Sequence, residues 1–272
     1  MEKSEGALYL FCFARPEQAR QVAASSVDER NPVFIFRHSA DVCAVIGEVA
    51  REDFCGPAAE RQMEQLSWVG PRALRHEAVI EEVMEHSPVL PARFGTLFSS
   101  LPALTQFMDA HRAVIAQFLG RVDGQREWSV QGRFDRNRAQ QARAAERLAA
   151  EQIYLSGLAE GTRYFAEKRI RQQAEQELGG WLEQTLRQVA HNLAQHATDF
   201  RQCDTLGRER SDNQAEEVLN YAFLLPESKA ASFLQEVDRA NLEHAAEGLE
   251  FERSGPWPPF RFVPALAGAE AP

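Results

Sequence analysis

The chain has 272 residues, of which 44% are hydrophobic and 26% charged, the balance of a globular protein with a substantial core. Its formal net charge of −10 opposes binding to nucleic acid phosphates and to anionic membrane surfaces. Residues 133–147 contain several arginines, which leaves a local basic contact as the alternative. These arginines alternate with Asp, Glu, Gln and Ala, so a solvated helix face is favoured. We therefore expect neither nucleic acid nor a membrane as partner.

The cysteines and the N-terminus indicate a cytoplasmic protein. The cysteines are scattered, with no Cys-x-x-Cys pair and no histidine at the spacing of a zinc site. The first residues are polar, and the apolar run after them is too short for a secretory signal and has no basic leader. No stretch approaches the length of a membrane span. Contact with a membrane or particle would therefore be made through partners. The four cysteines are Cys12, Cys43, Cys55 and Cys203.

The first part of the chain predicts strands followed by helices. Residues 7–14 (ALYLFCFA) read as a buried strand closed by Arg15-Pro16, and residues 33–37 and 42–49 as a hairpin beside it. Helices are then predicted at 58–66, from Gly70-Pro71 to Ser87-Pro88, and at 101–119, with an extended segment at 89–98. This order predicts an α+β sandwich of the ferredoxin-like kind, with helices on one face of the sheet.

A glycine-containing stretch at 120–124 predicts a hinge between two domains. We expect an N-terminal ferredoxin-like domain at 1–122 and a C-terminal α+β domain at 123–272. In the second domain, strands are expected at 127–133, 217–225 and 249–253, and a helix at 228–247. The second domain thus repeats the order of strands and helices of the first.

A long helical hairpin is the distinguishing element of the predicted second domain, at about 137–203. Helical propensity is high from 137 to 178, and Gly179-Gly180 is expected to stop that helix and form the hinge. The next helix has apolar side chains at the 4-3 spacing of a coiled-coil seam. His196 on this seam is interpreted as a packed histidine, not as a metal ligand. The seam residues are Leu182, Leu186, Val189, Leu193, His196 and Phe200.

Enzyme motifs are absent from the sequence. Gly-x-Ser-x-Gly, the P-loop and the dinucleotide-binding glycine pattern do not occur. His76 and His86 are ten residues apart, about 15 Å along a helix, so they cannot share a metal ion. The glutamates between them are interpreted as the polar face of an amphipathic helix. We therefore predict no catalytic residue, no metal ligand and no cofactor.

Two proline-rich segments stand out instead. In SPVLPARFGT, Pro88 and Pro91 hold the backbone extended and withhold hydrogen-bond donors, which suits a sheet edge or a bend. Arg93 follows as a cation beside an aromatic ring. A packed strand entry and an edge that docks a partner are equally compatible with this segment. In GPWPPFRF, aromatic residues alternate with prolines, so the segment must pack against a surface, either of its own domain or of a partner.

These two segments, in this order, resemble the gas vesicle protein F/L family. The first resembles that family's Pro-x-Leu-Pro-x-Arg-Phe-Gly-Thr motif and the second its C-terminal Gly-Pro-Trp-Pro-Pro-aromatic signature. Phe260 stands where tyrosine is common and Arg261 where a small polar residue is usual, so no role is implied for a hydroxyl there. The matching positions are Pro88, Leu90, Pro91, Arg93, Phe94, Gly95, Thr96, Gly255, Pro256, Trp257, Pro258, Pro259 and Phe260.

The resemblance implies a non-enzymatic accessory protein for building gas vesicles, with two α+β domains and a coiled-coil element. It implies contact with the small hydrophobic shell protein, GvpA, and with other accessory proteins during assembly. It places the protein in the cytoplasm and at the gas vesicle. A small-molecule binder or enzyme on a ferredoxin-like scaffold is the alternative. A structural component retained in the finished vesicle is the third hypothesis.

Overall fold

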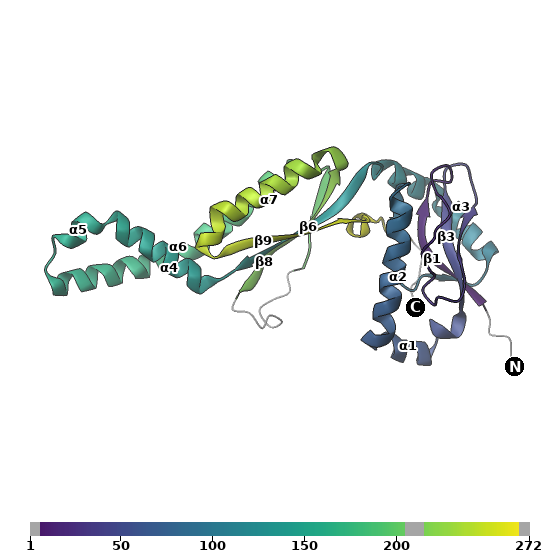
Figure 1. The fold of residues 1–272 in the computed structure, drawn as a ribbon, viewed down its shortest axis with the longest axis horizontal. Coiled ribbons are helices and arrows are strands. Elements are labelled where there is room, and N and C mark those ends of the chain that lie inside the picture. Colours follow the sequence, from purple (N-terminus) through teal and green to yellow (C-terminus); the bar gives the residue numbers. More distant parts are fainter. Residues whose placement is uncertain (1–5, 205–214, 267–272) are drawn as a thin grey trace. The chain divides into compact units, whose positions relative to one another are not determined.

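The computed structural model describes residues 6–204 and 215–266. Helices and two antiparallel sheets make up the chain, which confirms the predicted α+β class (Figure 1). The residues up to Glu127 and those from Pro256 onward form one compact unit, and Trp128–Gly255 form the other. These units differ from the predicted ranges 1–122 and 123–272, because the C-terminal segment belongs with the first unit. The predicted ranges as independently folding domains stay a prediction.

The sheet of the first unit has the strand order β2-β3-β1-β4, with β5 also paired to β1. Each of these pairs is antiparallel. The β2-β3 hairpin thus lies beside β1 as predicted, and the order is that of a ferredoxin-like sheet. The strands are β1 (Gly6–Ala14), β2 (Val33–Arg37), β3 (Cys43–Ala50), β4 (Val89–Pro91) and β5 (Leu97–Phe98).

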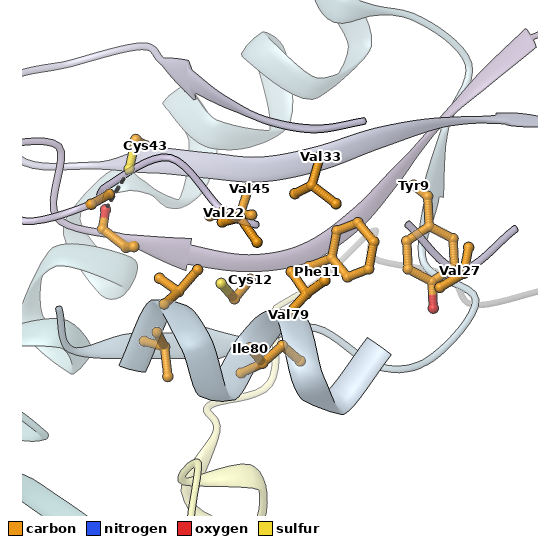
Figure 2. Close-up of a cluster of buried hydrophobic side chains, with 14 of the residues drawn as sticks. Tyr9, Phe11, Cys12, Val22, Val27, Val33, Cys43, Val45, Val79 and Ile80 are labelled. Atoms are coloured by element: carbon orange, nitrogen blue, oxygen red, sulfur yellow. Dashed lines mark hydrogen bonds between the residues drawn. The ribbon is translucent and has the colours of Figure 1, made fainter. Parts of the chain in front are cut away.

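Strand β1 is buried on both faces. Phe11 and Cys12 point toward Val79 and Ile80 of helix α2 (Leu66–Met84), as Figure 2 shows. On the other face, Phe13 stacks on Phe107 of helix α3 (Leu101–Arg121) with ring centroids 6.2 Å apart. The prediction that the helices cover a single face was wrong. The near-continuous apolar run of β1 is the pattern of a strand covered on both sides.

The remaining helices of this unit are short or cover the second face. A 3-10 turn, η1 (Arg51–Asp53), leads into α1 (Pro57–Met63), and α3 spans Leu101–Arg121.

Helix α2 begins before the predicted start at Gly70-Pro71. Pro71 removes one hydrogen bond close to the helix start, and burial of the following turns against β1 offsets that loss.

The second unit has a four-stranded sheet in the order β7-β8-β6-β9, covered by α6 and α7 through a shared apolar core. Phe223 of β8 and Phe233 of α7 lie at the centre of this core, with ring centroids 5.2 Å apart. The elements are β6 (Gln125–Phe134), β7 (Asp199–Gln202), β8 (Glu216–Pro226), β9 (Leu249–Trp257), α4 (Arg136–Ala150), α5 (Gln152–Ser156), α6 (Glu160–Ala194) and α7 (Ala230–His244), with 3-10 turns η3 (Glu227–Lys229) and η4 (Ala245–Glu247).

The predicted helical hairpin is present, but its turn is in a different place. Helix α4 packs against α6, and the chain reverses around α5 and Gly157. Helix α6 runs through Gly179-Gly180 without a break, so the predicted hinge there was wrong. Flanking turns with buried apolar residues hold these glycines helical, and tertiary packing overrides their low propensity. Phe200 was also misplaced, since it lies in strand β7 and not on the helical seam.

The glycine pair offers a test of this correction. Both glycines are exposed, and a Cβ atom at either would meet no atom within 4 Å. Gly179→Ala and Gly180→Ala should each raise the free energy of unfolding by about 0.5–1 kcal/mol, because alanine loses less entropy in a helix. Urea denaturation measures this. A hinge at 179–180 would make both changes destabilising.

Gly248→Ala is the matched control, for which we expect a change in stability of the opposite sign. Gly248 has a φ of +78°, and a Cβ atom there would lie 2.6 Å from the Asp135 carbonyl oxygen. This substitution should lower stability by about 1 kcal/mol or more in the same assay.

Candidate partner-binding site

The two proline-rich segments meet at one cavity in the first unit. The cavity has a volume of about 560 Å³ and is lined mainly by apolar side chains. Pro91, Arg93 and Phe94 line it from the first segment, and Phe260 lines it from the second. Neither segment forms the cavity alone, although 166 residues separate Phe94 from Phe260 in the numbering. Further lining residues of the two segments and their surroundings are Leu90, Thr96, His76, Glu77, Phe107 and Val263.

The first segment forms the edge of the sheet and then a tight turn. Strand β4 ends the strand order, so the prolines lie at a sheet edge as the sequence predicted. In the turn, the Thr96 amide donates to the Arg93 carbonyl at 3.1 Å and the Thr96 hydroxyl to the same oxygen at 2.7 Å. Gly95 has a φ of +84°, which a type II turn requires at its third position. Glycine is therefore needed here for the backbone conformation.

A buried hydrogen-bond chain fixes this turn to the core. The Gly95 amide donates to the Tyr9 hydroxyl oxygen at 3.1 Å, and that hydroxyl lies 3.0 Å from His76 Nδ1. His76 Nε2 lies 3.2 Å from the Ala92 carbonyl oxygen, which can only accept. Nε2 therefore carries the proton, and Nδ1 accepts the proton of Tyr9. Each donor in this series of hydrogen bonds therefore has one acceptor.

Burial keeps the His76 ring neutral. Its side chain is packed among aromatic rings, with Phe94 edge-on at a centroid distance of 5.9 Å. Desolvation lowers the pKa of His76 to about 4, with the hydrogen bond to the Ala92 carbonyl opposing that shift. From the sequence, His76 was only excluded from a metal site shared with His86, and its burial was not predicted. Its position three residues before Val79, on the apolar stripe of the helix, was the signal.

Arg93 is the exposed residue of this anchored turn. Its side chain is exposed and makes no hydrogen bond or ion pair with any residue that the structure describes. Phe94, the next residue, packs against the buried cluster. The turn therefore presents a free cation at the mouth of an apolar cavity.

The second segment is anchored by a buried carboxylate. Glu127, whose side chain is 1% exposed, accepts from the Arg261 amide at 2.9 Å and from its guanidinium at 2.8 Å. These bonds hold the 3-10 turn η5 (Phe260–Phe262), in which Phe262 is buried and Phe260 packs against the core of the first unit. Arg261 thus has a structural role that no sequence pattern indicated.

The structure separates the predicted motif residues into three groups. Pro88, Gly95, Pro258 and Pro259 are buried and hold the backbone of the two segments. Pro256 and Trp257 are exposed at the end of β9 and do not line the cavity, and neither does Gly255. The lining residues among the predicted set are Leu90, Pro91, Arg93, Phe94, Thr96 and Phe260.

Within 6–204 and 215–266, no three His, Cys, Asp or Glu side chains are grouped so that they could hold a metal ion. No helix in the same ranges has the length and apolar character needed to cross a membrane.

Fold and site together define a two-unit α+β protein with a helical hairpin and an apolar cavity formed by two distant segments. The sequence matches the family described as gas vesicle synthesis protein GvpL/GvpF over residues 7–264. The chain belongs to the GvpL/GvpF family, and its role is related to gas vesicles.

Individual relatives support the assignment over nearly the whole chain. Gas vesicle protein L of Streptomyces sp. (strain CB03234) is 26% identical over 263 residues, covering 94% of this chain and 92% of the relative. Gas vesicle protein L1 of Halobacterium salinarum is 23% identical over 275 residues, covering 95% and 90%.

Solved structures show the same fold. The crystal structure of GvpF from Anabaena sp. PCC7120 superposes with a TM-score of 0.66 at 19% identity, covering 96% of this chain and 97% of that one. GvpF from Microcystis aeruginosa gives a TM-score of 0.64 at 19% identity, with coverages of 95% and 99%.

The neutral state of His76 predicts a pH-dependent stability. The folded state lowers the pKa from 6.5 to about 4, so the unfolded chain binds the proton more readily between these values. Stability should therefore be full above pH 6.5 and should fall by roughly 2–3 kcal/mol on acidification to pH 4.5. Urea denaturation at pH 8 and pH 4.5 measures the loss.

His76→Phe is the control, since phenylalanine keeps the ring and cannot bind a proton. Other titrating groups contribute equally to both proteins, so the difference between their two losses isolates His76. Equal losses in the two proteins would show that this histidine is already protonated or exposed in the folded state.

Proposed function

We propose that this chain is a non-enzymatic accessory protein that binds the small hydrophobic shell protein of the gas vesicle, GvpA, during assembly. Other accessory proteins are further partners in this proposal. The observation that carries it is the apolar cavity of about 560 Å³ between the two motif segments, with the unpaired cation of Arg93 at its mouth. We place the shell-protein contact at this cavity, and we propose that the protein acts in the cytoplasm and at the gas vesicle.

The chemistry of the cavity suits an apolar side chain next to a carboxylate. Phe94, Phe260 and Leu90 supply apolar walls, whose contact with a partner removes hydrophobic surface from water. Arg93 adds a charge that can pair with an acidic residue beside the inserted side chain, and such pairing gives orientation and specificity more than affinity. A shell subunit that polymerises through apolar surface would be protected from aggregation by such a binder.

Strand β4 limits how far a partner can pair with the sheet beside the cavity. It is an edge strand of only three residues, and its Pro91, with Pro88 just before the strand, keeps the edge from pairing with another sheet along its whole length. A partner can therefore run along this edge only briefly before its side chains reach the cavity. Limited pairing of this kind favours reversible binding, which a transient assembly factor needs.

Small-molecule binding is the second candidate, because a cavity of this volume lies within the range of ligand pockets. The polar groups around it argue for the first proposal. Both His76 nitrogens, the Tyr9 hydroxyl and the Thr96 hydroxyl have partners within the chain. Few polar groups are left to orient a polar ligand. A compound that co-purifies with the chain at a fixed ratio would favour this second candidate.

Binding to the shell protein is tested by coproduction of the two proteins and affinity capture. Arg93→Glu should reduce capture about tenfold, because it replaces a free cation with a like charge to the carboxylate expected on the partner. Phe260→Ala should reduce capture by a similar factor, because it removes an apolar wall of the cavity. Circular dichroism and urea denaturation verify that each variant is folded.

Arg61→Glu is the matched control, since Arg61 is exposed on α1 of the same unit and does not line the cavity. It should leave capture unchanged. If folded Arg93 and Phe260 variants capture the shell protein as well as the wild type, the cavity is not the contact. If the wild type itself captures none, with the other accessory proteins present, the proposed function fails.

The hypothesis of a retained structural component predicts a different result. Quantification of the chain in washed vesicles distinguishes a retained structural component from a transient assembly factor. A transient factor should be lost on washing, whereas a shell component should remain in fixed proportion to GvpA.

A further inference from the structure

The helical hairpin of the second unit carries a groove along the junction of its two helices. The groove has a volume of about 340 Å³. Gln140, Ala144 and Leu148 line it from α4 at a spacing of four residues, so they form one stripe about 12 Å long. Arg171 and Glu175 line it from α6, also four residues apart. Small side chains on α4 allow another backbone to come close.

The groove continues as an exposed surface toward the tip of the hairpin. Tyr164, Lys168, Arg171 and Glu175 follow spacings of four, three and four residues, which places them on one face of α6. Tyr164 is 63% exposed, and Phe165, in edge-to-face contact with it, is 71% exposed. A hairpin of two helices cannot cover this face by itself.

The charges on this face are unbalanced. Lys168 and Arg171 are exposed and make no hydrogen bond or ion pair with the residues that the structure describes. Glu175, by contrast, accepts a hydrogen bond from Gln140 Nε2 at 3.2 Å. The face thus combines exposed aromatic side chains, a groove with small side chains and two free cations, on a chain whose net charge is −10.

We propose that this face binds an amphipathic helix of a partner protein, with carboxylates directed at Lys168 and Arg171. The third helix lies along the groove and extends to Tyr164, which requires about 16 Å, or three helical turns. Packing of a helix into a two-helix groove buries the apolar side chains Ala144 and Leu148 that the hairpin leaves open. The partner's carboxylates supply the missing charges.

Two other occupants fit the face less well. A second copy of the chain, paired about a two-fold axis, would bring the same cation-bearing face against itself. An anionic lipid surface would attract Lys168 and Arg171, but it would meet the Glu175 carboxylate and would leave the groove unfilled. A helix with an apolar stripe and acidic flanks satisfies both the shape and the charge.

The test uses the full chain with photoreactive p-benzoylphenylalanine in place of Ala145, an exposed residue of the groove. It is coproduced with GvpA and the other accessory proteins, and crosslinked peptides are identified by mass spectrometry. We expect crosslinks to residues three or four apart in a predicted amphipathic helix that contains Asp or Glu. The same reagent in place of Glu183, an exposed residue of α6 outside the groove, should give no such crosslink.

Charge reversal completes the test. The double variant Lys168→Glu with Arg171→Glu should lower the crosslinking yield about fivefold or more, whereas Arg187→Glu, an exposed change elsewhere on α6, should not. Crosslinks to a second copy or to lipid alone, no crosslink at all, or a yield unaffected by the double variant would each overturn the inference.

The inference rests on the proposed function only for the choice of coproduced proteins. Its failure is distinguishable from failure of that function. A chain that captures GvpA through Arg93 and Phe260 but gives no crosslink at position 145 refutes only the helix-binding face. If the crosslink forms but the Arg93→Glu and Phe260→Ala changes leave the capture of GvpA unaffected, only the proposed contact at the cavity is refuted.

Discussion

The hydrogen-bond chain from Gly95 through Tyr9 and His76 to Ala92 is the interaction on which the candidate site depends. It joins β1, α2 and the loop after β4, so three elements fix one turn. This series of hydrogen bonds requires a neutral imidazole, because a protonated Nδ1 of His76 could not accept from the Tyr9 hydroxyl. Burial supplies that neutrality and the hydrogen bonds satisfy the buried polar groups. With the turn held in this way, Phe94 packs inward and Arg93 is left outside.

The cavity is completed by a segment from the other end of the chain. Glu127 is buried at the start of β6, and its carboxylate would be costly there without partners. Arg261 supplies both an amide and a guanidinium donor, so the same contact satisfies the carboxylate and positions Phe260. The second unit lies between these two residues in the sequence. Formation of the cavity therefore requires the return of the chain after β9, and truncation before Pro256 would remove one wall.

Local patterns in the sequence predicted most strands and the α+β class, because apolar periodicity is decided within a few residues. They failed where a distant contact decides the outcome. Gly179-Gly180 stays helical because its neighbours pack on the sheet, and Arg261 acquires its role from Glu127, 134 residues away. The two motif segments were identified by their prolines and aromatic residues. Their meeting at one cavity could not be predicted, since no pattern within either segment specifies the other.

Both proposed contact surfaces place free cations beside apolar side chains on an acidic chain. Arg93 has this position at the cavity, and Lys168 and Arg171 have it on the hairpin. The net negative charge repels acidic molecules in general, so in both proposals a carboxylate of the partner meets the chain at an unpaired cation, next to Glu77 at the cavity and Glu175 on the hairpin. Apolar contact then supplies the binding energy, and the cation selects the orientation. A hydrophobic partner without a well-placed carboxylate would gain the first effect but not the second, which gives an assembly factor a means to distinguish its partners from other exposed apolar surfaces.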